Sequence, residues 1–284
     1  MYFQDIILNL KKFWREEGCN IFESFNDEIG AGTFHPFTML KPYCFNIWNV
    51  AYTQVCIRPN DGKYANNFNK SQHYYQFQVL LKPSTDYIKY QCLRSIKILG
   101  MSNNLYDLKF IDSDWSNPTL GACGIGWEIL CNGMEIIQFT YMQRIGGIEC
   151  AIIPGEITYG LERISMYLQE KNNIWNLVWG YNFLTYKELF LFQEKEFCIF
   201  YYYFSNTNFL IESFVQYELQ FKYSISKKTF YPAYSFCLKA CNIFNSLQAK
   251  KVLSSRERYF YISRLRKIVK ICCDNYIQNF SYIK

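Results

Sequence analysis

The chain has 284 residues, of which 50% are hydrophobic, and its net charge is +6. This composition excludes an intrinsically disordered protein and is sufficient for one large core, or for one core with a helical appendage. Charge alone does not indicate a nucleic-acid-binding protein, because a mildly basic balance is common among lysine-rich surfaces.

The twelve cysteines are spread irregularly and include no CxxC pair, and the chain has only two histidines. We therefore expect buried reduced thiols, with no disulfide scaffold and no structural zinc. No apolar run approaches the ~20 residues that cross a bilayer, and no basic stretch precedes an apolar segment at the N-terminus. We expect a cytoplasmic protein that does not enter a membrane.

The first predicted element is a helix over residues 5–17, because four apolar side chains share one helical face: Ile6, Leu10, Phe13 and Trp14. Gly18 is suited to end this helix in the left-handed conformation. Enrichment in Val, Tyr, Ile and Phe predicts strands over 50–58 and 73–81. A helix over 86–99 follows, which begins near Asp86 and ends at Gly100.

Three further strands are predicted in succession, over 106–112, 124–131 and 134–142, and a fourth lies near 148–153. Helical periodicity returns over 158–169 and again after about residue 175, where four helices are predicted over 185–196, 208–223, 233–247 and 255–280. Strands followed by flanking helices predict an α+β fold with a mixed, mostly antiparallel sheet. We expect a sheet domain over 1–172 and a helical domain over 173–284.

Two strands and a polar loop bring chemically useful side chains together. The first strand ends in Ile57-Arg58-Pro59-Asn60-Asp61-Gly62, and the second begins His73-Tyr74-Tyr75-Gln76-Phe77-Gln78-Val79. A guanidinium binds a phosphate through two parallel N–H bonds, and a phenyl ring stacks on a purine, so the pair suits a nucleotide. Further along, glycines at 155 and 160 precede a helical pattern whose first turn carries Arg163.

These two segments resemble motifs 2 and 3 of the class II aminoacyl-tRNA synthetases. Nearly the whole chain is similar to the alpha subunits of bacterial tetrameric glycyl-tRNA synthetases, with further ordered matches at Gly30-Ala31-Gly32-Thr33, His35-Pro36, Asn117-Pro118-Thr119-Leu120-Gly121-Ala122, Gly126-Trp127-Glu128 and Asn132-Gly133-Met134-Glu135. The resemblance implies a class II catalytic domain over 1–172 that converts glycine and ATP to glycyl-adenylate and pyrophosphate. It also implies transfer of glycine to tRNA(Gly) and an alpha dimer joined to beta subunits, as alpha2beta2.

The resemblance assigns Arg58 to the α-phosphate of ATP, His73 to the phosphate side of the hairpin and Phe77 to stacking under the adenine. It assigns Arg163 to the opposite face of the nucleotide, near the γ-phosphate. Glu135 is expected to hold Mg²⁺ between the ATP phosphates, with Glu128 as the alternative and Gln138 as a further ATP contact. Strict alternation places Glu135 and Gln138 on opposite strand faces, so either a bulge intervenes or their roles differ.

Glycine has no side chain to recognise, so its pocket must bind an ammonium and a carboxylate and exclude larger groups at Cβ. Glu156 is assigned to the ammonium, because related alanyl enzymes carry an acidic residue at this point. Neutral polar residues suited to complete the pocket are Gln76, Gln78, Thr140 and Thr158. Glu128 is a second candidate for the ammonium, and Trp115 or Trp127 is suited to close the pocket.

The loop of motif 2 departs from the family pattern. It reads Gly62-Lys63-Tyr64-Ala65-Asn66-Asn67-Phe68-Asn69-Lys70 where relatives usually have Gly-Arg-Tyr-Gly-Glu-Asn-Pro-Asn-Arg. Lysine lacks the forked geometry of arginine, so contacts with pyrophosphate or the tRNA end are expected to be weaker. Two alternatives stay open: a class II homologue that activates an amino acid without charging tRNA, and a degenerate non-catalytic subunit.

Overall fold

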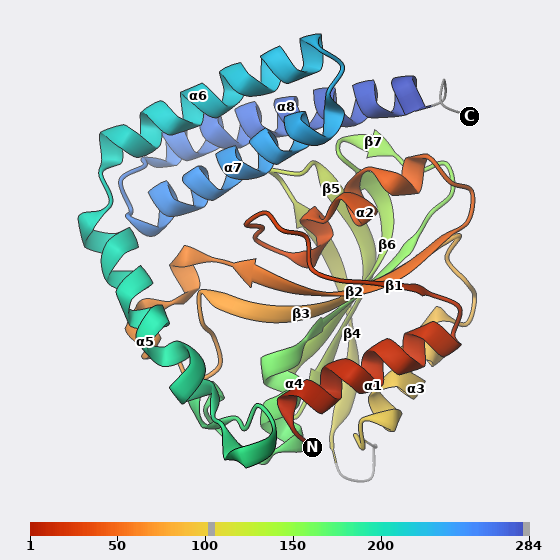
Figure 1. Cartoon of the computed structure of the whole chain (residues 1–284). Helices are drawn as coiled ribbons and strands as arrows, with labels where there is room; N and C mark the ends of the chain where they lie inside the picture. The colour runs from red at the N-terminus through yellow and green to blue at the C-terminus, as the bar shows by residue number, and fades with distance from the viewer. Residues whose placement is uncertain (102–105, 281–284) are drawn as a thin grey trace.

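An eight-stranded sheet forms the centre of the computed structural model, which describes residues 1–101 and 106–280 (Figure 1). The strand order is β1-β2-β3-β8-β6-β5-β4, and the short β7 pairs with β6. The strands are β1 Asn20–Phe22, β2 Trp48–Ile57, β3 His73–Lys82, β4 Leu108–Asn117, β5 Ala122–Cys131, β6 Met134–Ile145, β7 Ile148–Glu149 and β8 Gly155–Gly160. Only β1 and β2 pair in parallel among these strands, so the predicted α+β class with a mostly antiparallel sheet is confirmed.

Three helices cover one face of the sheet: α1 Phe3–Glu16, α3 Ile88–Ile98 and α4 Leu161–Leu168. The apolar stripe predicted for the first helix is confirmed, because its four side chains are buried in the core that α1 shares with α3, α4 and the sheet. Gly18 follows α1 with a φ of +90°, and Gly100 follows α3 with a φ of +91°. Both glycines therefore adopt the left-handed conformation that ends a helix.

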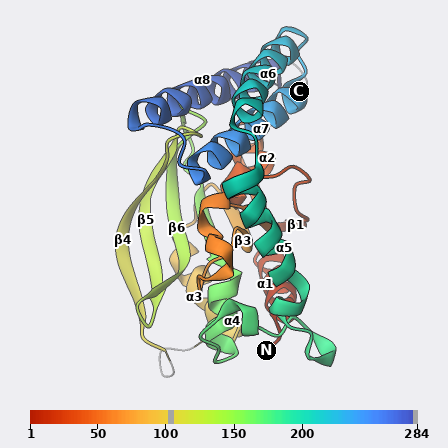
Figure 2. The same cartoon turned by 90° about the vertical axis from the view of Figure 1, so that its left-hand side faces the viewer.

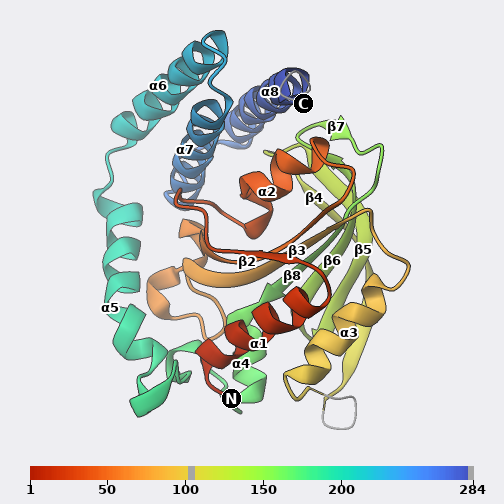
Figure 3. The same cartoon turned by 45° about the vertical axis from the view of Figure 1, so that its right-hand side comes forward.

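A second group of helices packs at the edge of the sheet where β5 begins and β6 ends (Figure 3). It consists of α6 Thr207–Ser226, α7 Phe230–Ala249 and α8 Ser255–Phe280. They share a separate core with the short α2 Pro36–Met39 and with the ends of β5 and β6. The helix α5, Tyr186–Ile199, continues through a π-helical turn, Phe200–Phe204, and runs along the side of the molecule toward α6 (Figure 2). All four predicted C-terminal helices are confirmed.

The helices of the second half contact the first half directly. The Tyr234 hydroxyl donates to the Phe34 carbonyl at 2.6 Å, and Arg266 Nε donates to the Pro118 carbonyl at 3.0 Å. The division into domains 1–172 and 173–284 stays a prediction. No helix among the described residues is both long and apolar enough to cross a membrane.

The sequence prediction was wrong between residues 148 and 160. The expected strand 148–153 is reduced to β7, and residues 158–160 belong to β8 instead of a helix, since α4 begins only at Leu161. β8 lies between β3 and β6, where Glu156, Ile157 and Tyr159 are all buried. Polar Glu156 and Thr158 alternate with apolar Ile157 and Tyr159, but β8 is only six residues long and runs directly into α4, so its last residues were assigned to the helix.

Candidate active site

A cavity of about 440 Å³ opens on the sheet face opposite α1. Its lining comes from segments far apart in the sequence: the 31–33 segment, the β2–β3 hairpin, β4, β5, β6, β8 and α4. Its polar, charged and aromatic lining residues include Thr33, Arg58, Tyr74, Gln76, Trp115, Glu128, Glu135, Gln138, Thr158, Glu162 and Arg163. The structure thus brings the predicted motif 2 and motif 3 arginines to one cavity.

Arg58 directly follows β2 and reaches the cavity from the hairpin. Its Nε donates to the Gly30 carbonyl at 2.8 Å, and its guanidinium carbon lies 4.9 Å from the centre of the Tyr74 ring. The Tyr74 hydroxyl donates to the same carbonyl at 2.8 Å. One side of the guanidinium is therefore fixed, while its terminal nitrogens have no hydrogen-bond partner among the residues that the structure describes.

Alternation along β3 decides which aromatic ring faces the cavity. Tyr74 and Gln76 line the cavity, whereas Phe77 is 0% exposed and packs at 5.9 Å from Tyr159 in the core beneath α1. The Phe77 ring is therefore inaccessible to an adenine in this conformation, which corrects the expectation that it stacks there. Tyr74 is the aromatic side chain that β3 presents to the cavity.

His73 also turns away from the cavity. It begins β3, and its ring lies 5.0 Å from the Phe197 ring on α5. Its Nδ1 is 3.9 Å from the Glu194 carboxylate, which is too long for a hydrogen bond. The imidazole therefore belongs to the contact between the hairpin and α5.

Arg163 and Glu135 form an ion pair at the edge of the cavity. Arg163 Nη1 donates to the Glu135 carbonyl at 2.8 Å and to its carboxylate at 3.2 Å. Ile129 pairs with Ile137 but Leu130 pairs with Glu135, so Ile136 is an extra residue in β6. This bulge changes the phase of the strand and brings Glu135 to the cavity with Gln138, which decides between the two options that the sequence left open.

Glu156 is on the same face of β8 as Thr158, two residues earlier in the strand, and is 2% exposed. Its Oε1 accepts from Thr33 Oγ1 at 2.8 Å and from the Gln78 amide, and Gln78 Oε1 accepts from Thr158 Oγ1 at 2.8 Å. Burial raises the pKa of the Glu156 carboxyl from 4.5 to about 7, against the opposing effect of these hydrogen bonds. Thr33 and Thr158 line the cavity, so they connect it to the buried carboxylate.

The other residues predicted for glycine divide into those that line the cavity and those that are buried next to it. Gln76, Thr158 and Glu128 line the cavity, whereas Gln78 and Thr140 are fully buried beside Glu156. Trp115 lines the cavity. Trp127 lies on the opposite side of the sheet, where it stacks on Phe139 at 5.3 Å, so of the two tryptophans only Trp115 is placed to close the pocket.

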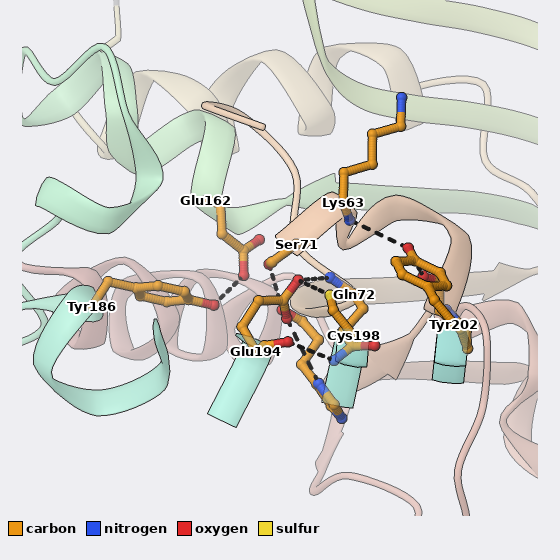
Figure 4. A network of polar contacts seen from close by, with 10 residues as sticks. Lys63, Ser71, Gln72, Glu162, Tyr186, Glu194, Cys198 and Tyr202 are labelled. Atoms are coloured by element: carbon orange, nitrogen blue, oxygen red, sulfur yellow. Dashed lines mark hydrogen bonds and ion pairs between the residues drawn. The ribbon is translucent and has the colours of Figure 1, made fainter. Parts of the chain in front are cut away.

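Cavity residues that were not predicted from the sequence include Thr33, Tyr74 and Glu162. A Cβ on Gly32 would lie 2.6 Å from Gln78 Oε1, so only glycine lets this segment approach the sheet and place Thr33. Glu162 is buried and accepts from the Tyr75 N–H at 2.7 Å and from the Tyr186 hydroxyl at 2.8 Å (Figure 4). Burial raises its carboxyl pKa to about 7.

A family model and two curated relatives name the same kind of protein. A family model described as the glycyl-tRNA synthetase alpha subunit matches residues 3–281. The chain is 43% identical over 280 residues to the glycine–tRNA ligase alpha subunit of Rickettsia canadensis (strain McKiel), and 42% identical to that of Rickettsia bellii (strain OSU 85-389). Both alignments cover 97% of this chain and 97% of the relative. The pyrrolysyl-tRNA synthetase PylSc of Desulfitobacterium hafniense overlaps 64% of this chain and 72% of its own, with 9% identity and a TM-score of 0.41.

Proposed function

Because the chain belongs to the glycyl-tRNA synthetase alpha subunit family, we propose that its cavity is where ATP and glycine meet. The chain is accordingly a subunit of an aminoacyl-tRNA ligase that uses ATP. The two substrates are proposed to bind between Arg58 and Arg163 and to react to glycyl-adenylate and pyrophosphate. The observation that supports this most is the convergence of these two arginines, from motifs far apart in sequence, on one cavity.

The reaction needs positioning and charge stabilisation more than proton transfer. The glycine carboxylate is already ionised near pH 7, and one of its oxygens bonds to the α-phosphorus as the bond to the β-phosphate oxygen breaks. Arg58 is proposed to hold the α-phosphate through its terminal nitrogens, since its Nε is already held by the Gly30 carbonyl. Arg163 is proposed to exchange its contact with Glu135 for the phosphates on the other side.

Magnesium fits the carboxylates of this cavity. Glu135 and Glu128 both line it, and carboxylate oxygens are the ligands that Mg²⁺ prefers, usually one or two from the protein with the remainder from water and phosphate. When bound, the ion would neutralise charge on the leaving pyrophosphate. Gln138 lies on the same side of β6 as Glu135 and is proposed to contact ATP.

The adenine is proposed to lie against the Tyr74 ring, the aromatic surface that β3 presents to the cavity. Glycine is proposed to lie at the end formed by Thr33, Gln76 and Thr158, with its ammonium directed toward Glu156. A nearby cation favours the ionised carboxylate, so glycine binding would lower the pKa that burial has raised. Close packing at this end excludes a side chain at Cβ by steric contact.

The name of the relatives, alpha subunit, points to a second kind of subunit. We propose a beta subunit as partner in an alpha2beta2 assembly, tRNA(Gly) as the acceptor of glycine, and a cytoplasmic location. Charging of tRNA(Gly) with radiolabelled glycine, with and without the beta subunit of the same organism, tests this. A homologue that only activates glycine would exchange pyrophosphate without charging tRNA, and a degenerate subunit would do neither.

A further inference from the structure

The loop of the β2–β3 hairpin lies against helix α5 of the second half of the chain (Figure 2). The Glu194 carboxylate, 2% exposed, accepts from the Gln72 backbone N–H at 2.9 Å, and the Gln72 side chain donates to the Glu194 carbonyl at 3.3 Å (Figure 4). A Cβ on Gly62 would lie 2.9 Å from the same carboxylate and 2.5 Å from Cys198 Sγ. The loop therefore packs on α5 with no space for a larger residue at 62.

The same contact leads directly to the proposed ATP site. The Gln72 carbonyl accepts from the Arg58 backbone N–H at 2.7 Å, one step beyond the last paired residues of the hairpin, Ile57 and His73. Ser71, next to Gln72 in the chain, lines the cavity together with Asn69 and Lys70. Two hydrogen bonds therefore connect the Glu194 carboxylate to the backbone of Arg58.

Glu194 supplies a hydrogen-bond acceptor to a buried backbone N–H of the hairpin. A buried carboxylate is costly unless its hydrogen bonds are made, and the described residues place no lysine or arginine within ion-pair distance of Glu194. The basic side chain near it is that of His73, at 3.9 Å. The principal partner of the Glu194 carboxylate is the Gln72 backbone N–H. An apolar side chain at position 194 would leave that N–H without an acceptor.

We propose that Glu194 is a positioning residue that holds Arg58 in the geometry for phosphate binding. Helix α5 thereby contributes to the active site without touching a substrate. This inference rests on the proposed function, because it takes Arg58 as the residue that holds the α-phosphate.

The test compares Glu194→Ala with Glu194→Gln in glycine-dependent ATP–pyrophosphate exchange. The alanine variant leaves the Gln72 N–H without its acceptor, and we expect kcat/KM for ATP to fall by about 10- to 100-fold, because a misplaced arginine loses its alignment. The KM for glycine should stay within roughly twofold, since Glu194 does not touch the glycine end. The glutamine variant keeps the acceptor and should stay within about threefold of the wild type.

Glu218→Ala is the matched control. Glu218 on α6 accepts from Arg264 on α8, so the variant loses a half-buried ion pair remote from the hairpin. We expect it to lower the melting temperature without changing the kinetic constants for ATP. If Glu194→Ala does not fold, Glu194→Asp replaces it, because the shorter side chain keeps the charge but withdraws the acceptor.

Three results would each overturn the proposal. The first is unchanged kinetic constants for ATP in folded Glu194→Ala, and the second is a change in the glycine KM as large as the change for ATP. The third is a glutamine variant as impaired as the alanine variant. Calorimetry on the same variants gives their dissociation constants for ATP. These constants distinguish a failure of the Glu194 proposal from a failure of the proposed function. A wild type that binds ATP but shows no exchange would refute the proposed activity, and the ATP constants would still decide the role of Glu194. A wild type that binds no ATP would overturn both.

Discussion

Replacing Glu156 by glutamine should raise stability and weaken glycine binding together. Burial raises the carboxyl pKa from 4.5 to about 7, so the folded protein binds a proton between these pH values that the unfolded chain has lost. Stability from this group is therefore present below about pH 4.5 and is lost as pH rises toward 7. The difference between the two pKa values corresponds to roughly 3 kcal/mol lost by pH 8.

The amide of Glu156→Gln has no charge to desolvate and keeps an oxygen that accepts from Thr33. Relative to the wild type, the variant should thus gain about 3 kcal/mol between pH 4.5 and 8, a melting temperature higher by roughly 5 °C. The loss of the ion pair with the glycine ammonium should raise the half-saturating glycine concentration by about 30- to 800-fold, from roughly 2 to 4 kcal/mol. Alanine should stay excluded, because that exclusion is steric.

Thermal melting at pH 5 and pH 8 and exchange kinetics over a glycine series measure both effects on one preparation. The ATP requirement is the internal control and should change little, since Glu156 is buried, does not line the cavity and bonds to Thr33 and Gln78 instead of to either arginine. A more stable variant with an unchanged glycine requirement would refute the ammonium role and leave Glu156 a structural residue. A raised ATP requirement would instead favour Glu128 for the ammonium.

Arg58→Ala should reduce pyrophosphate exchange by more than about 100-fold, and Arg58→Lys should recover little, because lysine lacks the fork; near-normal exchange by a folded alanine variant would refute the assignment. Tyr74→Ala should raise the KM for ATP by roughly 5- to 20-fold, as expected for loss of a stacking surface, and should also lower the melting temperature, because the Tyr74 hydroxyl bonds to the Gly30 carbonyl. Phe77→Ala should instead cost about 3 to 5 kcal/mol of stability and leave the ATP KM of the folded fraction unchanged; the reverse pattern would restore the stacking role to Phe77. The isolated chain should dimerise through its N-terminal third, because the resemblance to class II synthetases places motif 1, which builds their dimer interface, around His35-Pro36; an active monomer by light scattering at micromolar concentration would contradict this.

The parts of the fold that sequence predicted best carry a strong local signal. The helix α1 shows this as an apolar stripe, and the β2–β3 hairpin has strong β-forming residues on both sides of a polar loop. The strand β8 was missed because it has only six residues and joins α4 without an intervening loop, so its last residues were read as the start of the helix.

The candidate site shows a similar division. Motif positions predicted that Arg58 and Arg163 belong to one site, and both line the same cavity; their contact with phosphates stays a prediction. The facing direction of side chains was less predictable. The bulge at Ile136 and the burial of Phe77 both depend on which layers cover the sheet, and the contact of Glu194 with the hairpin joins segments that no motif connects. These relations arise only in the folded chain.

The central claim, that this cavity forms glycyl-adenylate, is tested most directly by ATP–pyrophosphate exchange with the beta subunit present. The exchange is measured with glycine, with alanine and without amino acid. We predict exchange that requires glycine, is absent with alanine and is lost in Arg58→Ala. Exchange that is independent of glycine, or no exchange by a folded protein that binds ATP, would contradict the claim that this cavity forms glycyl-adenylate.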